Sequence, residues 1–208
     1  GRGSGKSFAV TVFLTLLTMT KGIRILFTRY TMVSAHLSII PEFLEKIGLL
    51  GFDEVFSINK QEVLNTKNGS DILFRGIRTS AGNQTASLKS LQGISNWVLD
   101  EAEELIDENI FDTIDLSIRE KDIHNRIILI LNPVTKEHWI YNRFFEEKGV
   151  EGGFNGVKDN VCYIHSTYLD NKESPFYNNK TSRSITIYTP LYIYTYIHTY
   201  THTYIHIH

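Results

Sequence analysis

The first seven residues constrain the fold of this chain more than any other feature. They read Gly-Arg-Gly-Ser-Gly-Lys-Ser, the last seven positions of the pattern G-x-x-x-x-G-K-[ST], whose first glycine would come one residue earlier. In loops of this pattern, backbone N–H groups wrap around phosphates, the lysine reaches the β- and γ-phosphates, and the final hydroxyl holds Mg²⁺. We therefore expect Gly3, Ser4, Gly5, Lys6 and Ser7 to bind nucleotide phosphates, and Ser7 to bind Mg²⁺ as well.

A helix should follow such a loop, because its N-terminus would face the phosphates. Residues 7–19 are apolar nearly all round, which predicts a helix buried between a sheet and its neighbours. The alternative is a secretory signal with Arg2 and Lys6 as its basic region. We favour the helix because no small-residue cleavage site follows and a β-rich run, residues 23–28, comes directly afterwards.

Strand and helix patterns alternate along the chain up to residue 165. Strands are expected at 23–28, 54–58, 62–64, 71–74, 96–99, 126–131 and 161–165, and helices at 7–19, 34–49, 103–119 and 136–148. Pro41 should start or kink the second helix, residues 67–70 should form a tight turn around Asn-Gly, and the polar residues 80–90 a loop. This alternation predicts an α/β fold of the phosphate-loop NTPase class, with a largely parallel sheet flanked by helices.

The overall composition suits one globular domain with an appendage. The 208 residues are 42% hydrophobic with a formal net charge of −2, which gives no overall sign of nucleic-acid binding but leaves a local basic patch open. Cys162 is the single cysteine, so an internal disulfide is excluded, and this fits a reducing cytosol. No Cys/His spacing of the zinc-binding type is present.

The composition changes near Ser182, and after Leu191 only Tyr, Ile, Thr and His occur. Codons built from alternating T, A and C would encode such a tract, as in a translated simple repeat. Its histidines could bind metal, but we favour a non-native low-complexity extension. Because the tract is β-prone and offers no apolar stripe, we expect residues 182–208 to pack poorly.

Residues 96–104, Asn-Trp-Val-Leu-Asp-Glu-Ala-Glu-Glu, supply a second motif. An apolar strand that ends in Asp-Glu is what phosphate-loop ATPases place beside the loop, so Asp100 should bind Mg²⁺ and Glu101 should polarise the attacking water. The alternative is an acidic first turn of a helix, which the helix dipole favours. The Gly-Lys-Ser loop upstream favours the metal and base roles.

A third polar position follows the strand expected at 126–131. Asn132 would lie at the carboxyl edge of the sheet, where ligands bind in open α/β sheets, and could sense the γ-phosphate. The alternative is a simple Asn-Pro turn. The spacing leaves both interpretations open.

These motifs, in this order, resemble the tailed-phage terminase large subunit, in the branch typified by defective prophages of Gram-positive bacteria. The segments that carry the resemblance are 1–7, 88–105, 131–141 and 164–172. The resemblance implies an N-terminally truncated, terminase-like ATPase domain over residues 1–172, followed by a non-homologous low-complexity tail over 173–208. Because the strand that should precede the loop is not in the sequence, we expect the chain to fold marginally and to hydrolyse ATP poorly.

The family resemblance also implies chemistry and partners. In that family an ATPase drives DNA into an empty procapsid, so ATP and Mg²⁺ are the expected cofactors, and Glu101, Arg2 and Asn132 the expected catalytic residues. Arg2 would act on the γ-phosphate and Asn132 would couple hydrolysis to movement. The implied partners are double-stranded phage DNA, the portal protein, the terminase small subunit and further copies in a ring, with no membrane, in the bacterial host cytoplasm. An inert prophage relic and a helicase-like DNA-dependent ATPase are the alternatives.

Overall fold

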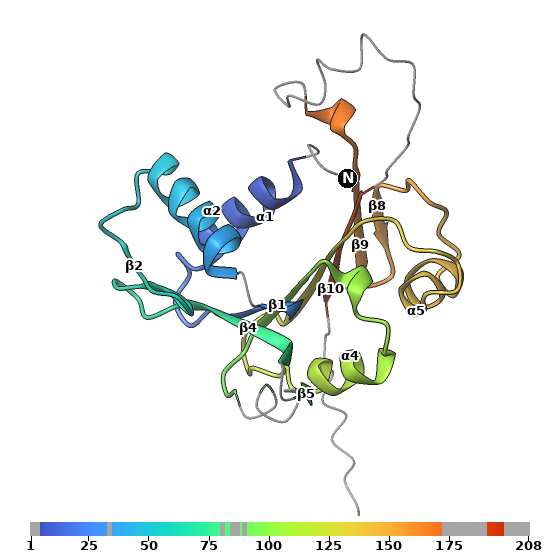
Figure 1. Ribbon diagram of the computed structural model, residues 1–208, viewed down its shortest axis with the longest axis horizontal. Helices are drawn as coiled ribbons and strands as arrows, with labels where there is room; N and C mark the ends of the chain where they lie inside the picture. The colour runs from blue at the N-terminus through green and yellow to red at the C-terminus, as the bar shows by residue number, and fades with distance from the viewer. Residues whose placement is uncertain are drawn as a thin grey trace, which may run out of the picture.

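The computed structural model describes residues 5–32, 35–79, 82–83, 88, 91–171 and 191–197, with backbone alone for 35–38, 79, 82–83, 168 and 191–197. In these residues a twisted sheet is covered by helices on both faces (Figure 1). The strand order is β2-β3-β4-β1-β6-β7-β10-β9-β8, with β5 paired to β4. The predicted α/β architecture is therefore confirmed.

The centre of the sheet is parallel. It consists of β4 (Asp71–Thr79), β1 (Arg24–Thr31), β6 (Asn96–Asp100) and β7 (Arg126–Leu131), which pair in that order. All five residues of β6 are buried, as are five of the six in β7. Strands buried on both faces are almost continuously apolar, which is why these two segments could be recognised from the sequence.

Antiparallel strands extend the parallel centre on both sides. On one side lie β3 (Glu62–Asn65), β2 (Phe56–Ile58) and the short β5 (Gly82–Asn83); on the other lie β10 (Leu191–Ile197), β9 (Val161–Ser166) and β8 (Gly156–Lys158). The predicted turn over residues 67–70 connects β3 to β4, with Gly69 at a φ of 78°. Parallel pairing in the described residues is thus confined to the four central strands.

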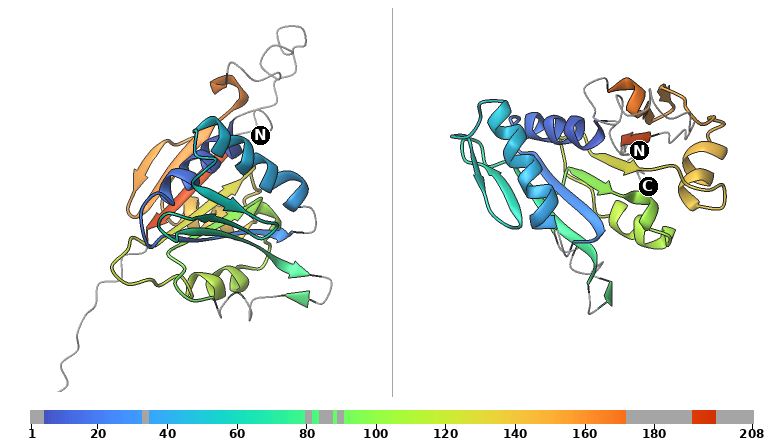
Figure 2. Two further views of the ribbon diagram at one scale, coloured as in Figure 1. Left: turned by 90° about the vertical axis from the view of Figure 1, so that its left-hand side faces the viewer. Right: turned by 45° about the horizontal axis from the view of Figure 1, so that its top comes forward.

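Two apolar layers hold the sheet between its helices (Figures 1 and 2). On one face, α1 (Lys6–Leu17) and α2 (Ala35–Leu49, with Pro41 inside it) cover a cluster that includes Leu14, Phe27, Phe43, Val98 and Ile128. On the other, α4 (Glu108–Asp115), α5 (Trp139–Tyr141) and the π-helical turn η2 (Asn142–Glu146) cover a cluster that includes Leu26, Trp97, Phe111, Trp139 and Tyr163. Alternate residues of each central strand serve the two layers.

Two predicted helices are shorter than the sequence suggested. The helix expected at 103–119 is a 3₁₀ turn, η1 (Ala102–Glu104), followed by α4, because the Asp107 carboxylate caps a new helix by accepting a hydrogen bond from the Asn109 backbone N–H. The helix expected at 136–148 spans only 139–146. His138 caps it, since its Nδ1 accepts from the Ile140 N–H.

Residues 191–197 differ from the expectation that residues 182–208 pack poorly or are disordered, because their backbone forms a paired strand. These residues form β10, which pairs antiparallel with β7 on one side and with β9 on the other. Both neighbours would otherwise present unpaired backbone edges, and an alternation of Ile, Tyr and Thr is suited to fill the gap. The other residues of that tract lie outside the described part of the chain, as does most of the loop expected at 80–90.

The sequence also predicts that the chain has no membrane-spanning segment. None of the described helices is both long enough and apolar enough to cross a bilayer.

Tyr163 gives a pH-dependent prediction for the second layer. Its side chain is buried, its hydroxyl donates to the Phe144 carbonyl, and burial raises its pKa from 10.0 to about 12. Because the folded-state pKa lies above that of the unfolded chain, this stabilising contribution is complete below about pH 10 and is lost as the pH rises through 12. In urea melts at rising alkaline pH, wild type should lose its stability advantage over Tyr163→Phe. A constant difference between the two would contradict the prediction.

Candidate functional site

The first turn of α1 places Lys6 and Ser7 at the carboxyl edge of the parallel strands. Gly5 precedes the helix with a φ of 76°, a conformation that residues with a Cβ adopt only with strain, and its carbonyl accepts from the Ala9 N–H at 2.9 Å. The predicted phosphate-contacting residues Gly3 and Ser4, and the predicted catalytic residue Arg2, lie outside the described residues. Of the predicted loop, the structure thus describes Gly5, Lys6 and Ser7, which form the turn into α1.

Lys6 is joined to the end of β7 and to the segment after β6 by two hydrogen bonds in series. Its Nζ donates to Asn132 Oδ1 at 2.9 Å, and Asn132 Nδ2 donates to Glu103 Oε1 at 2.5 Å. Burial lowers the pKa of Lys6, an effect that the negative charge of Glu103 opposes. The amide of Asn132 is therefore a direct hydrogen-bond partner of the Lys6 ammonium.

Glu103 connects this pair to the second helical layer. Its Oε2 is buried and has no hydrogen-bond partner among the described residues. Its backbone carbonyl lies 3.2 Å from His138 Nε2. Two residues further on, the Leu105 carbonyl accepts from Trp139 Nε1 at 2.5 Å. η1 and the following Leu105 thus connect the end of β7 to the start of α5.

Asp100 ends β6 and is held by an arginine from the neighbouring strand. Arg29 Nε and Nη2 both contact Asp100 Oδ2, at 2.7 and 2.6 Å, and Arg29 Nε lies 3.7 Å from Glu101 Oε2. Glu101 has a φ of 55°, which is uncommon for a residue with a side chain and turns the chain from β6 into η1. Burial raises the pKa of Glu101, against the opposing effect of the Arg29 charge.

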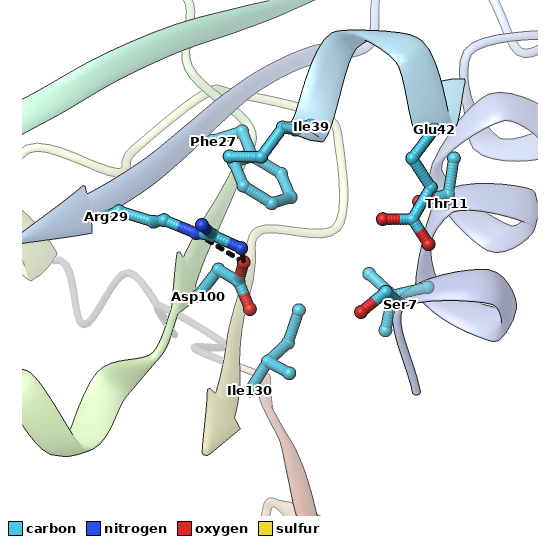
Figure 3. A pocket seen from close by; sticks show the side chains of 9 residues that line it. Ser7, Thr11, Phe27, Arg29, Ile39, Glu42, Asp100 and Ile130 are labelled. Carbon is cyan, nitrogen blue, oxygen red and sulfur yellow. Dashed lines mark hydrogen bonds and ion pairs between the residues drawn. The ribbon is translucent and has the colours of Figure 1, made fainter. Parts of the chain in front are cut away.

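A pocket opens between the Arg29–Asp100 ion pair and α1 (Figure 3). Its polar lining consists of Ser7, Thr11, Arg29, Glu42 and Asp100, and its apolar lining of Val10, Phe27, Ile39 and Ile130. The Ser7 hydroxyl faces Asp100 across the pocket in Figure 3. Burial raises the pKa of Glu42, which reaches the pocket from α2.

The pocket suits Mg²⁺ by the chemistry of its donors. Ser7 and Asp100 offer oxygen atoms, which this ion prefers, and they lie on opposite walls of one pocket. Among the described residues, no group of three or more His, Cys, Asp or Glu side chains could hold a metal by itself. At nucleotide sites Mg²⁺ is usually held by one or two protein ligands, with phosphates and water completing the shell.

The structure thus brings together six residues that the motifs pointed to: Gly5, Lys6, Ser7, Asp100, Glu101 and Asn132. It adds Arg29, Glu42 and Glu103, whose positions the sequence reasoning did not use. Arg29 carried a signal, because it follows the strand expected at 23–28 and so had to lie near the carboxyl edge. Glu42 carried none, since it is one acidic residue on a helix.

Comparison with known protein families shows which family the chain belongs to. A model of the phage terminase large subunit matches residues 1–193. The chain belongs to the phage terminase large subunit family. The match runs past residue 172, where the resemblance in the motifs ends, into the first residues of β10.

Solved terminase structures have the same fold. The large terminase of a thermophilic bacteriophage, in complex with ADP, superposes with a TM-score of 0.60 at 13% identity, over 90% of this chain and 44% of that one. The ATPase domain of the large terminase of a Thermus phage, in an arginine mutant, gives 0.51 at 19% identity, over 77% of this chain and 66% of that domain. This terminase chain therefore spans less than half the length of the ADP-bound terminase. Comparison with curated protein sequences gives no match.

Proposed function

We propose that this terminase chain forms the ATP-hydrolysing part of a phage DNA-packaging motor. The observation that carries the proposal is the meeting of Lys6, Asn132 and the acidic end of β6 at one edge of the sheet. A lysine at a helix N-terminus, a carboxylate at a strand end and an adjacent glutamate are the parts that phosphoryl transfer to water requires. The ADP in the structure of the thermophilic phage terminase supports a nucleotide as the ligand of this fold.

Each residue then has a defined task. Lys6 would exchange Asn132 for the phosphates, because a phosphate oxygen is a stronger acceptor for an ammonium than a neutral amide. Ser7 and Asp100 would hold Mg²⁺, which would neutralise charge on the phosphates. Glu101 would orient a water molecule and accept its proton.

The remaining assignments follow from family membership rather than from this geometry. We propose that Arg2 acts on the γ-phosphate, that Asn132 links hydrolysis to movement, and that Gly3 and Ser4 line the phosphates. For the whole protein we propose double-stranded DNA, the portal protein and the terminase small subunit as partners, a ring of copies, and the host cytoplasm as its location. We further propose that the terminase-like ATPase domain covers residues 1–172, and that the tail of residues 173–208 adds β10 to its sheet.

A binding experiment tests the nucleotide site directly. Lys6→Ala should weaken Mg·ADP binding by about 10- to 100-fold, since a hydrogen bond to a charged group contributes about 1.5–3 kcal/mol. Lys21→Ala is the matched control, because Lys21 lies exposed beyond the C-terminal end of α1. Isothermal titration of ADP into the three proteins gives the affinities. Equal affinity of wild type and Lys6→Ala would remove the loop from nucleotide binding, and no binding by wild type would favour the inert relic.

A further inference from the structure

Arg29 is the one cationic side chain among the described residues that line the pocket. It reaches the pocket from β1, which runs parallel to β6 and is paired with it up to Thr28 and Leu99. This register places Arg29 beside Asp100 at the end of the neighbouring strand. The charge is therefore fixed by the sheet itself and not by a mobile loop.

The two carboxylate oxygens of Asp100 have different surroundings. Both Arg29 nitrogens bond to Oδ2, at 2.7 and 2.6 Å. In Figure 3 the other oxygen points away from Arg29 into the pocket, on the side where the Ser7 hydroxyl lies. The Arg29 side chain is 22% exposed and that of Asp100 12%, so the pair is largely shielded from water.

The same charge acts on two further carboxylates. Arg29 Nε lies 3.7 Å from Glu101 Oε2, and Glu42 lines the pocket on the wall opposite Arg29. Without Arg29, the carboxylates of Asp100 and Glu42 would line the pocket with no cation between them and Glu101 would lie beside it, and such a site attracts a divalent cation. With Arg29 present, part of that attraction is cancelled.

We propose that Arg29 is a positioning residue that acts as the internal counter-ion of the acidic end of β6. It holds Asp100 with a single oxygen toward Ser7, and it keeps free Mg²⁺ out of the pocket until a polyphosphate brings the ion in. Without such a counter-ion, the pocket would bind Mg²⁺ before any nucleotide arrived. The proposal deepens the proposed function and rests on it, since it takes the metal to be the Mg²⁺ of the nucleotide.

Titration with Mn²⁺ alone, followed by electron paramagnetic resonance, tests this without nucleotide or turnover. Arg29→Gln should bind Mn²⁺ about tenfold more tightly than wild type, because a repelling charge a few ångströms from the ion is gone. Arg29→Lys should stay close to wild type, since it keeps the charge. Arg75→Gln is the matched control: it removes a charge from the same sheet, and Arg75 bonds instead to the Gln61 and Phe74 carbonyls.

Two double variants make the test specific and guard against misfolding. In an Asp100→Asn background, Arg29→Gln should no longer tighten Mn²⁺ binding, because the coupling runs through that carboxylate. Arg29→Gln with Glu101→Gln restores the charge balance, so it should fold even where the single variant does not, and it should bind Mn²⁺ more tightly than Glu101→Gln alone.

The proposal would be overturned if Arg29→Gln left Mn²⁺ binding unchanged or weaker both in the wild-type background and in the Glu101→Gln background. ADP binding by wild type and Lys6→Ala is a separate measurement, so the outcomes can be told apart. Loss of the ADP difference with the Mn²⁺ effect intact rejects the nucleotide function alone. Loss of the Mn²⁺ effect with ADP binding intact rejects the role of Arg29 alone.

Discussion

Replacing Glu101 with glutamine should slow ATP hydrolysis by roughly 10²–10⁴-fold while nucleotide affinity stays close to that of wild type. Glutamine keeps the size and the hydrogen-bonding oxygen of the side chain but cannot accept the proton of the attacking water. The carboxylate lies at the turn from β6 into η1, held near Arg29 and half-buried, so it is oriented before any substrate arrives. A change in rate with little change in binding is the sign of a group that acts in the transition state.

Phosphate release under single-turnover conditions, with and without Mg²⁺, measures this rate. Glu104→Gln is the matched control, because Glu104 carries the same group three residues along the chain and is exposed. We expect wild-type turnover to need Mg²⁺, since Ser7 and Asp100 act through the ion. Near-normal turnover of Glu101→Gln would remove this glutamate from the mechanism and direct attention to Glu103, whose Oε2 is buried and without a hydrogen-bond partner among the described residues.

Replacing Trp97 with alanine should destabilise the fold by roughly 3–5 kcal/mol. The indole of Trp97 in β6 is fully buried, with its ring centroid 5.1 Å from that of Phe111. Its Nε1 donates to Thr28 Oγ1 at 2.8 Å, and Thr28 Oγ1 in turn donates to the Val98 carbonyl at 3.0 Å. The substitution therefore opens a cavity and also leaves a buried hydroxyl without its donor.

Urea denaturation monitored by circular dichroism gives the loss in unfolding free energy. Trp97→Phe should lower the unfolding free energy less than the alanine variant, because it keeps most of the apolar volume, although it also loses the hydrogen bond. Leu49→Ala should change the unfolding free energy by less than about 0.5 kcal/mol, since Leu49 is 66% exposed. A Trp97→Ala midpoint equal to that of Leu49→Ala would show that β6 is not at the centre of the core.

The contacts at the end of β7 bear on how nucleotide could affect the rest of the molecule. Lys6 bonds to Asn132 and Asn132 to Glu103, and the Glu103 carbonyl lies against His138 at the start of α5. A phosphate that displaces Asn132 from Lys6 therefore changes a contact with η1, on which α5 rests. This gives Asn132 a structural connection suited to the coupling role that we propose for it.

The sequence alone determined the elements that depend on neighbouring residues. The loop over 1–7 indicated a phosphate site, and the fully apolar runs before Asp100 and Asn132 indicated buried parallel strands whose ends meet. These signals need no tertiary information, because strand burial and the Gly-Lys-Ser pattern impose their residue types locally.

Only the tertiary structure decided which distant residues complete the site. Arg29 meets Asp100 because β1 and β6 are neighbours in the sheet, and the order of strands is not written in any one segment. Two predicted helices begin later than expected because Asp107 and His138 cap their first turns. The tract 191–197 became a strand because β7 and β9 leave a gap between them, and a sequence with high strand propensity forms one where two backbone edges remain to be paired.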